Sequence, residues 1–538
     1  MPAPLRAVTG RLRSASRERR GVSYREFVER VEPALTARPR VHRFAVPALV
    51  GDPATPAAAL AVCIAPGGGG DAEATRDSLR SQTAAPAHVL EGTPTEALGE
   101  TWAPWLVLLR AGDRLAPHAL LRLGQAVTLA PDAAVLTCDS DVMGRGGQRS
   151  APRLGPGPSP DGVLATDQAG PPVLVAREPA LEAEAAPGPA WELELLLELA
   201  GPAAAGHAHV PQVLVHRTRQ PPADQQLLAA VAQRALHRRG DASARVEAAP
   251  TGQRRVRRAV SGEPSVEVIV CFRDQARLLE RCARSVLERT TYERLTLRLV
   301  DNHSSQPSLL ALLQELERHP RVAVARDDAP FNFAAVNNRA ALASSADFLV
   351  FLNNDTEVVT PAWVEELLEE AQREEVGAVG PLLTYPDGRV QHAGAALGLH
   401  GFAGHPFAGL DPGRGTPFGA AADGTRNWMA VTAACLMVER RKLDTVGGFD
   451  DSFAIGGNDV DLGLRLTAGG HRSLCVPHVR LLHDESGSRD PLDIPPGDYE
   501  RSRERYGRFR SVGDPFYNPN LTLRDTTCGL RSPQELDQ

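Results

Sequence analysis

The side chains best suited to chemistry gather at the end of an apolar run near residue 350. Residues 348–352 are apolar and short enough for a buried strand, and Asn353, Asn354 and Asp355 follow them. Polar groups of this kind are costly to bury unpaired, so we expect them at the rim of a sheet. Ligands of open α/β sheets lie beyond such strand ends, where Asp355 could hold a hard cation and a diphosphate. The alternative is an ordinary turn, because Asn and Asp are common turn residues.

Three residues elsewhere carry side chains that suit the same chemistry. Asp301 follows a predicted strand, where its carboxylate could accept a hydrogen bond from the N–H of a base. Asp459 lies at a glycine-rich turn before a helical segment, and a carboxylate there could act as a general base. His483 follows another predicted strand, and its imidazole could complete a metal site. The structural alternatives are, in the same order, a turn residue, helix capping by Asn458 or Asp459, and a structural histidine.

The elements that would position these residues alternate between strand and helix, which indicates an α/β fold with parallel, Rossmann-like sheets. In the second half we predict strands at 266–270, 295–300, 322–325, 348–352 and 474–482, and helices at 278–288, 309–318, 333–344, 361–373 and 460–466. In the first half we predict strands at 60–64, 105–109 and 210–215, and helices at 115–130 and 191–199. Glycine and proline content predicts a loop at 144–170 and a long mobile loop at 394–424.

The two halves contain a weak internal repeat. Glu192 and His216 are 24 positions apart, and Asp459 and His483 are also 24 positions apart. Several matches in the same order suggest duplication of one fold. The matching segments are 106–113 with 349–355, 191–199 with 458–466, and 210–216 with 476–483.

Composition limits the classes of protein to which the chain can belong. With 538 residues it is too long for one ordinary domain, and a hydrophobic content of 42% is enough for real cores. The net charge of −7 argues against bulk binding of nucleic acid. The seven cysteines are odd in number and form no C-x-x-C pair, which fits a reducing compartment and no structural zinc site.

Basic residues are concentrated in two places. Residues 1–43 contain eleven arginines against four glutamates, and a second cluster holds Arg254, Arg255, Arg257 and Arg258. The N-terminal segment could contact an anionic membrane surface or be a solvated tail. The sequence shows no signal peptide and no run of 18 apolar residues, so we expect a cytoplasmic protein that is at most peripheral to the inner face of the membrane.

Several stretches of the second half together resemble one known family; they lie at 268–274, 299–305, 331–340, 348–359, 388–394, 431–441, 446–466, 481–489 and 514–523. They resemble the family 2 glycosyltransferases with a GT-A fold. The resemblance is closest to bacterial enzymes that build rhamnose-containing, other O-antigen or capsular glycans. The first half resembles the same family more faintly, as in tandem enzymes that carry two such domains.

The resemblance implies a role for each matching residue. Asn353 stands where the family has the first Asp of its D-x-D motif, which lowers the charge of the site. Asp459 falls at the position of the catalytic base, and Asp355 and His483 fall at those of the ligands of Mn²⁺ or Mg²⁺. Trp428 and Asp461 would belong to the acceptor region. The residues implied for nucleotide-sugar binding are Phe272, Asp274, Asp301, Asn338, Asn353 and Asn354.

The first half departs from the family pattern. Arg110 occupies the region of the metal-binding carboxylate, and the helix at 333–344 has no counterpart. Glu192 and His216 remain in matching positions and are the candidates for a second active site. We expect a non-catalytic or weakened copy that positions the acceptor or supports assembly.

We therefore expect two GT-A domains in tandem, the first shortened and degenerate and the second complete. The expected activity is inverting, metal-dependent transfer of a sugar from a UDP- or dTDP-linked donor to a hydroxyl of a growing glycan or lipid-linked glycan. The alternatives are a glycan-binding or scaffolding protein and a bifunctional enzyme; a dehydrogenase is disfavoured because no G-x-G-x-x-G follows Val270. The expected segments are a basic lead-in (1–45), a degenerate domain (46–218), a connector (219–262), a catalytic domain (263–490) and a C-terminal extension (491–538).

Overall fold

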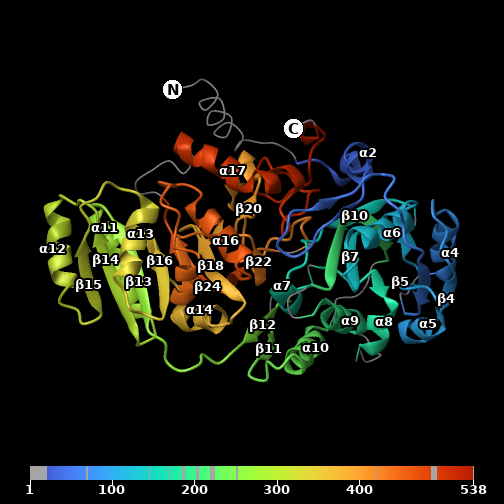
Figure 1. Ribbon diagram of the computed structural model, residues 1–538, viewed down its shortest axis with the longest axis horizontal. Helices are drawn as coiled ribbons and strands as arrows, with labels where there is room; N and C mark the ends of the chain where they lie inside the picture. Colours follow the sequence, from blue (N-terminus) through green and yellow to red (C-terminus); the bar gives the residue numbers. More distant parts are fainter. Residues whose placement is uncertain are drawn as a thin grey trace.

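Two mixed sheets lie next to each other along the long axis of the molecule, with helices packed around them (Figure 1). No helix in the described part of the chain is long and apolar enough to cross a membrane. Residues 1–20 of the basic lead-in, glycines 68–70 and positions 486–489 of the motif at 481–489 lie outside the described residues. The computed structural model describes residues 21–67, 71–144, 146–167, 169–183, 188, 190–201, 205–218, 224–249, 252–419, 421–485 and 494–536.

The sheet of the second half has ten strands within these ranges, and its first strands are parallel, as predicted. β16 then pairs antiparallel with β23, and β18 runs parallel to β24. In order across the sheet the strands are β15 (Val322–Arg326), β14 (Leu295–Asp301), β13 (Val266–Phe272), β16 (Phe348–Leu352), β23 (Cys435–Glu439), β18 (Val376–Thr384), β24 (Arg472–His483) and β17 (Thr356–Val358), with β19 (Val390–His392) on β18 and β22 (Arg426–Trp428) on β24.

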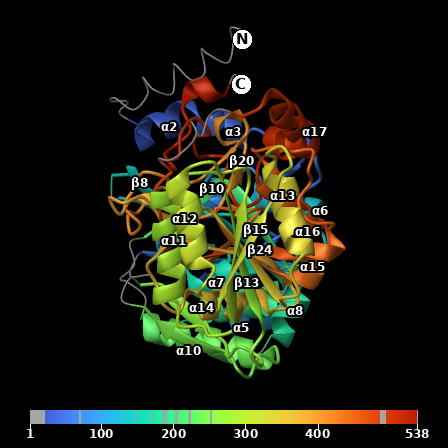
Figure 2. The ribbon, with the colours of Figure 1, turned by 90° about the vertical axis from the view of Figure 1, so that its left-hand side faces the viewer.

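Helices cover both faces of this sheet, which explains the unbroken apolar run of β16. Phe348, Val350 and Leu352 pack into the core beneath α11, α12 and α14, whereas Leu349 and Phe351 pack into the core beneath α13 and α16. Figure 2 shows the sheet between α11 and α12 on one side and α13 and α16 on the other. The helices are α11 (Ala276–Arg289), α12 (Pro307–Leu316), α13 (Phe333–Leu342), α14 (Trp363–Ala371), α15 (Arg440–Thr445) and α16 (Asn458–Ala468).

The sheet of the first half repeats the strand order and directions of the second. β8 (Arg149–Arg153) pairs with β7 as β19 pairs with β18, but no strand of the described residues corresponds to β15. Its helices include α4 (Ala72–Arg80), α5 (Pro94–Glu100), α6 (Ala119–Leu129), α8 (Arg177–Glu182) and α9 (Trp191–Ala200). In order the strands are β4 (Val89–Glu91), β3 (Ala61–Ala65), β5 (Trp105–Arg110), β9 (Leu174–Ala176), β7 (Val135–Met143), β10 (His207–Arg217) and β6 (Arg114–Leu115), matching β14, β13, β16, β23, β18, β24 and β17.

The predictions of a loop at 144–170 and of a mobile loop at 394–424 are both wrong. Both segments are rich in glycine and proline, yet each contains at least one short strand and a helix. The segment 144–170 contains β8 and the helix α7 (Pro160–Ala165), which begins with a proline behind the Ser159 cap. The segment 394–424 contains β20 (Ala396–Leu397), η1 (Leu399–Gly401) and β21 (Ala403–Gly404). Phe407 and Phe418 of that segment are buried in the core, so it is anchored to the body of the domain.

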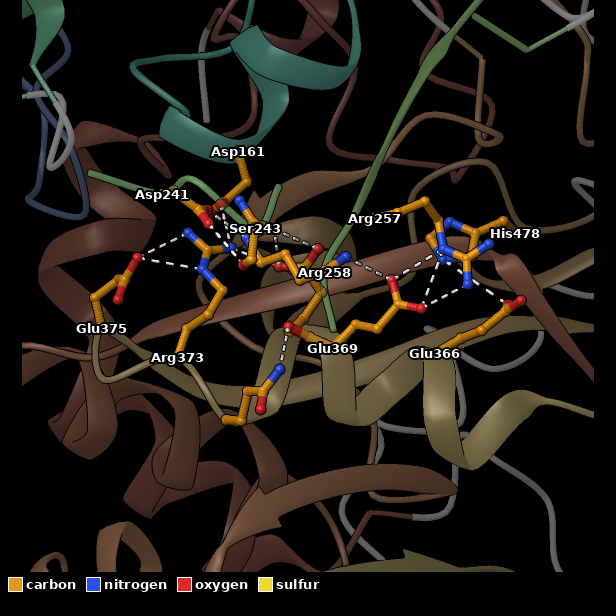
Figure 3. A network of polar contacts seen from close by, with 12 residues as sticks. Asp161, Asp241, Ser243, Arg257, Arg258, Glu366, Glu369, Arg373, Glu375 and His478 are labelled. Carbon is orange, nitrogen blue, oxygen red and sulfur yellow. Dashed lines mark hydrogen bonds and ion pairs between the residues drawn. The ribbon is translucent and has the colours of Figure 1, made fainter. Parts of the chain in front are cut away.

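The connector joins the halves through α10 (Gln225–Arg238) and a hairpin of β11 (Arg245–Ala248) and β12 (Arg254–Arg257). The second basic cluster lies on and after this hairpin, and each of its four arginines has an acidic partner. Arg257 contacts Glu369 at 2.7 Å and Arg258 contacts Glu370 at 2.9 Å, both on α14 (Figure 3). Arg257 and Arg258 therefore hold the connector against the second half, whereas Arg254 pairs with Asp167 of the first half at 2.8 Å.

A buried carboxylate of the first half completes this junction. Asp161 on α7 lies 2.7 Å from Nη1 of Arg373 (Figure 3). It also lies 3.5 Å from Nε of Arg472 and accepts a hydrogen bond from Nδ2 of Asn427 at 2.7 Å. Its three partners all belong to the second half. Burial alone would raise the pKa of Asp161, but the charges of Arg373 and Arg472 outweigh it and hold that pKa well below its usual range.

The C-terminal segment lies against both halves. The helix α17 (Pro496–Val512), which the sequence analysis did not predict, is followed by residues whose side chains reach into the first half. Asn518 and Asn520 each donate a hydrogen bond from Nδ2 to the buried carboxylate of Asp139 on β7, at 2.9 and 2.8 Å. Asp498 on α17 accepts the backbone N–H groups of residues 454–456. These contacts fix the turn that precedes α16.

Candidate active site

Asp355 and His483, expected at two strand ends, meet at one edge of the sheet. The backbone turns after β16, where the N–H of Asn353 donates to the carbonyl of Ala434 at 3.0 Å, and β17 then pairs with β24 so that Thr356 lies opposite His483. This register brings Oδ1 of Asp355 to 3.2 Å from Nε2 of His483. The chain therefore forms a turn after β16, which agrees with the alternative of an ordinary turn. The same turn also brings Asp355 next to His483, and these two side chains could bind a metal.

The pair fits a divalent cation. Two ligands about 2.1 Å from one octahedral ion and at right angles lie about 3.0 Å apart, close to the observed 3.2 Å. Nδ1 of His483 is buried without a partner among the described residues. No group of three His, Cys, Asp or Glu residues in the described part of the chain could hold a metal. If a cation binds here, the chain would supply these two ligands and phosphate or water oxygens the others, which is a usual arrangement for Mg²⁺.

Asp459 lies in the first turn of α16, but it does not cap the helix. The cap is Gly457, at φ 87°, and no side chain caps this end. Oδ2 of Asp459 accepts the backbone N–H of Ala433 at 3.2 Å, and Oδ1 accepts that of Val460 at 2.8 Å. Asn458 donates instead to the carbonyl of Ile455. The carboxylate is thus held by backbone donors in a half-buried position, which fits a general base better than a cap.

Residues 432–434 connect the parts of the site, a role that the sequence analysis did not assign. The N–H of Thr432 donates to Nε2 of His392 at 3.3 Å, and the next N–H, that of Ala433, donates to Asp459. The carbonyl of Ala434 accepts the N–H of Asn353. One short backbone segment therefore contacts the imidazole of His392, the carboxylate of Asp459 and the end of β16.

Two histidines near Asp459 were also missed. His392 is fully buried, and burial lowers its pKa well below the ordinary value, so the ring is neutral. The ring of His405 lies 4.5 Å from that of His392 at 79°. Burial lowers the pKa of His405, while the charges of Asp459 and Glu485 act to raise it. A histidine in the family-like stretch 388–394 was the available signal for His392.

The residues expected around the nucleotide lie at the carboxyl ends of β13 and β14. Asp274, at φ 55°, accepts the N–H groups of Ser305 and Gln306, and these bonds lower the pKa of its carboxyl. Asp301 accepts the N–H of Ser304 through Oδ1 at 2.8 Å. Phe272 lies opposite Asp301 in the β13–β14 register and is buried, so its ring belongs to the core beneath this edge.

The remaining expected residues have other roles in the structure. Asn338 uses both polar atoms on the backbone of Phe449, at 2.8 and 2.9 Å, so the side chain holds this turn in place. Trp428 is only 1% exposed and packs so closely on Gly394 that a Cβ there would lie 2.0 Å from the indole, so it cannot contact an acceptor directly. Asp461 is buried and ion-paired with Arg465 at 2.7 Å. Asn354 is half-buried at the turn.

The corresponding edge of the first half is closed by ion pairs. Arg110 takes both carboxylate oxygens of Glu192, at 2.9 and 2.7 Å. His216 is buried against Asp141, with 2.6 Å between Nδ1 and Oδ1. Asp113 pairs with Arg217 at 2.8 Å. Glu192 and His216 therefore do not face a shared ligand as Asp459 and His483 can.

Comparison with known proteins gives a consistent family. The family model "Glycosyl transferase family 2" matches residues 267–408. The chain is 40% identical over 465 residues to the O-antigen biosynthesis protein RfbC of Myxococcus xanthus. The alignment covers 83% of this chain but only 36% of RfbC, so this chain spans about a third of that relative. It is 30% identical over 236 residues to the N-acetylglucosaminyl-diphospho-decaprenol L-rhamnosyltransferase of Mycobacterium tuberculosis, covering 40% of this chain and 74% of that one.

Among solved structures, GalNAc-T7 with UDP, GalNAc and Mn²⁺ is similar over 45% of this chain and 48% of that chain, at 17% identity and a TM-score of 0.36.

Proposed function

The chain belongs to glycosyl transferase family 2 and is a glycosyltransferase, and on that premise we propose that its second half carries out inverting transfer of a sugar from a UDP- or dTDP-linked donor to a hydroxyl of a growing cell-surface glycan. The observation that carries the proposal is the placement of Asp355, His483 and Asp459 at one edge of the sheet. The segment 432–434 connects the strand end to the carboxylate.

Different residues of the chain would have different roles in this reaction. Asp459 takes the proton of the acceptor hydroxyl as its oxygen attacks the anomeric carbon. The new glycosidic bond forms on one face while the bond to phosphate breaks on the other, so the configuration inverts and the nucleoside diphosphate leaves with the electron pair. Mn²⁺ or Mg²⁺ on Asp355 and His483 would neutralise charge on the leaving diphosphate. Asp274 and Asp301 lie where they could orient the base.

We further propose that 263–490 is the catalytic GT-A domain and that 46–218 is a degenerate copy of it. The shared strand order supports the duplication, and the Arg110–Glu192 pair supports the loss of activity in the first half. The competing proposal of a second active site would need Glu192 free of Arg110. A purely scaffolding role is disfavoured because Asp355, Asp459 and His483 are all present.

The acceptor that we propose is a lipid-linked glycan. The mycobacterial relative is named for an N-acetylglucosaminyl-diphospho-decaprenol acceptor, and the myxobacterial one for O-antigen biosynthesis. Such an acceptor would place the enzyme at the inner face of the membrane. The free cysteines of the described residues fit the reducing cytoplasm on that side.

A donor screen tests the proposal. Full-length chain with Mn²⁺ is given UDP- and dTDP-sugars and a short-chain acceptor, N-acetylglucosaminyl-diphospho-farnesol, and release of nucleoside diphosphate is followed. Calorimetry with UDP and dTDP, with and without Mn²⁺, measures binding separately, and Asp355→Ala should remove the metal dependence of binding. The proposal is wrong if neither nucleotide binds and Asp459→Asn leaves transfer intact.

A further inference from the structure

We propose that His405 binds the acceptor: its Nε2 accepts a hydrogen bond from a sugar hydroxyl next to the one that reacts. The acceptor would then be a sugar with two neighbouring free hydroxyls. One would be held by His405 and the other presented to Asp459. This inference rests on the proposed function and specifies the acceptor side of the same site.

The hydrogen-bond partner of His405 fixes which nitrogen is free. Nδ1 lies 3.1 Å from the carbonyl oxygen of Gln391. A carbonyl can only accept, so Nδ1 carries the hydrogen and Nε2 carries the lone pair. Burial lowers the pKa of His405 and favours this neutral form. Among the described residues no hydrogen-bond partner engages Nε2, and the side chain is only half-buried, so a ligand can reach it.

A chain of contacts connects this imidazole to the proposed base. His405 packs at 4.5 Å against His392, whose Nε2 accepts the N–H groups of Gly394 and Thr432 at 3.2 and 3.3 Å. The next N–H after Thr432 is that of Ala433, which holds Asp459. The charge of Asp459 also acts on the pKa of His405, as expected for groups that lie close together.

The backbone around His405 is held firmly enough to select a ligand. His405 directly follows β21, and the hairpin of β20 and β21 is closed by pairs from Ala396 to Gly404 and from Leu397 to Ala403. On the other side, the N–H of Phe407 donates to the carbonyl of Thr526 at 2.7 Å. A group held by its own packing and by hydrogen bonds on both sides orients a ligand more effectively than a mobile one.

A histidine packed on another histidine could instead be purely structural, and two substitutions separate these roles. His405→Asn keeps a donor for the carbonyl of Gln391 but has nothing at the position of Nε2. His405→Gln places an amide near the position of Nε2. If the role is to bind acceptor, His405→Asn raises the acceptor KM about tenfold, as expected for one lost hydrogen bond, and His405→Gln restores much of it. Donor binding, measured by calorimetry with UDP or dTDP, stays unchanged in both variants.

Deoxy acceptors give the sharper test. N-acetylglucosaminyl-diphospho-farnesol is compared with its 3-, 4- and 6-deoxy analogues. The analogue that lacks the reacting hydroxyl is not glycosylated. Among the other two, we expect one to show an acceptor KM about tenfold higher with the unaltered chain and no further penalty with His405→Asn, because the two changes remove the same contact.

Three results would overturn the inference: an acceptor KM unchanged in His405→Asn, a deoxy penalty that persists in full in that variant, or no penalty for any non-reacting hydroxyl with the unaltered chain. The last result needs no variant, so it decides the matter even if His405→Asn does not fold. If Asp459→Asn abolishes transfer while His405→Asn is normal, only this inference fails. If the unaltered chain transfers nothing to the acceptor, the proposed function fails with it.

Discussion

Replacing Asp161 by asparagine should weaken the junction between the two halves more than any comparable change on the surface. Asp161→Asn keeps the shape of the side chain and removes its charge. Its partners Arg373 and Arg472 are only 12% and 4% exposed, so their guanidinium groups cannot turn to water. In either orientation the amide nitrogen of the new side chain would face a donor, Nη1 of Arg373 or Nδ2 of Asn427, where the wild type has an acceptor.

The size of the effect follows from these contacts. Removing one partner of a buried ion pair costs about 3–5 kcal/mol. Arg373 keeps Glu370 and Glu375, so we expect the lower end, about 3 kcal/mol. If the chain unfolds as one unit, its unfolding entropy is about 1.1 kcal/mol/K, and the melting temperature should fall by about 3 °C.

Scanning calorimetry of Asp161→Asn beside Glu374→Gln provides the test and its control. Glu374 is 72% exposed and pairs with Arg441 on the surface, where ion pairs contribute little, so its loss should barely change the melting temperature. Both changes turn a carboxylate into an amide, and they differ mainly in burial. Equal shifts for the two variants would refute the reasoning, because burial of the pair would then contribute nothing.

The difference in stability between the wild type and Asp161→Asn should depend on pH, because the pKa of Asp161 is lowered in the folded state. The pKa lies below the unfolded value of 3.8 because the two arginines favour the charged form. The stability that Asp161 contributes is therefore complete above the unfolded pKa and is lost as pH falls through the lower, folded pKa. The gap between wild type and Asp161→Asn should be constant from about pH 5 to 8 and should shrink only below about pH 4. A gap that already closes at pH 6 would contradict this assignment.

Three further outcomes are expected. Asp459→Asn should lower kcat for transfer by on the order of 10² or more while nucleotide binding by calorimetry is retained, and a normal kcat would remove Asp459 as the base. Glu192→Gln should leave all products unchanged because Arg110 already neutralises that carboxylate; loss of one of two linkages by product analysis would instead establish a second site. Asp498→Ala removes the acceptor for three N–H groups in 454–456, so kcat should fall more than binding of UDP or dTDP; equal losses would point to general unfolding.

The parts of the fold that were predictable from sequence are those encoded by local patterns. The apolar run 348–352 specifies a strand buried on both faces, and the alternation of such runs with helical segments specifies a layered sheet. Strand ends of one direction share one edge of a sheet, so Asp301 and Asp355 could be placed there in advance. His483 could be added because its predicted strand also ended in a polar residue, and the structure places it 3.2 Å from Asp355.

What could not be predicted depends on partners far away in the sequence. Asn338 and Trp428 have side chains typical of binding sites, but the backbone of Phe449 and the packing on Gly394 engage them, and no local pattern reveals either partner. In the sequence the cluster around Arg257 looks like a basic surface, but in the structure Arg257 pairs with Glu369 of α14. A local stretch of sequence gives the type of each residue but not its partner from a distant part of the chain. Contacts between buried polar groups are therefore the hardest to predict.

The first half nevertheless contributes to the proposed active site, through the C-terminal segment. Asp139 of the first half holds Asn518 and Asn520, and further along the same segment Thr526 accepts the N–H of Phe407, two residues after His405. The first half thus anchors the C-terminal segment, and that segment supports the backbone next to His405, for which we propose a role in acceptor binding. Ion pairs such as Arg110–Glu192 belong to the same half, where this one joins β5 to α9 without a ligand. Duplication followed by charge pairing would convert a second active site into a support for the first.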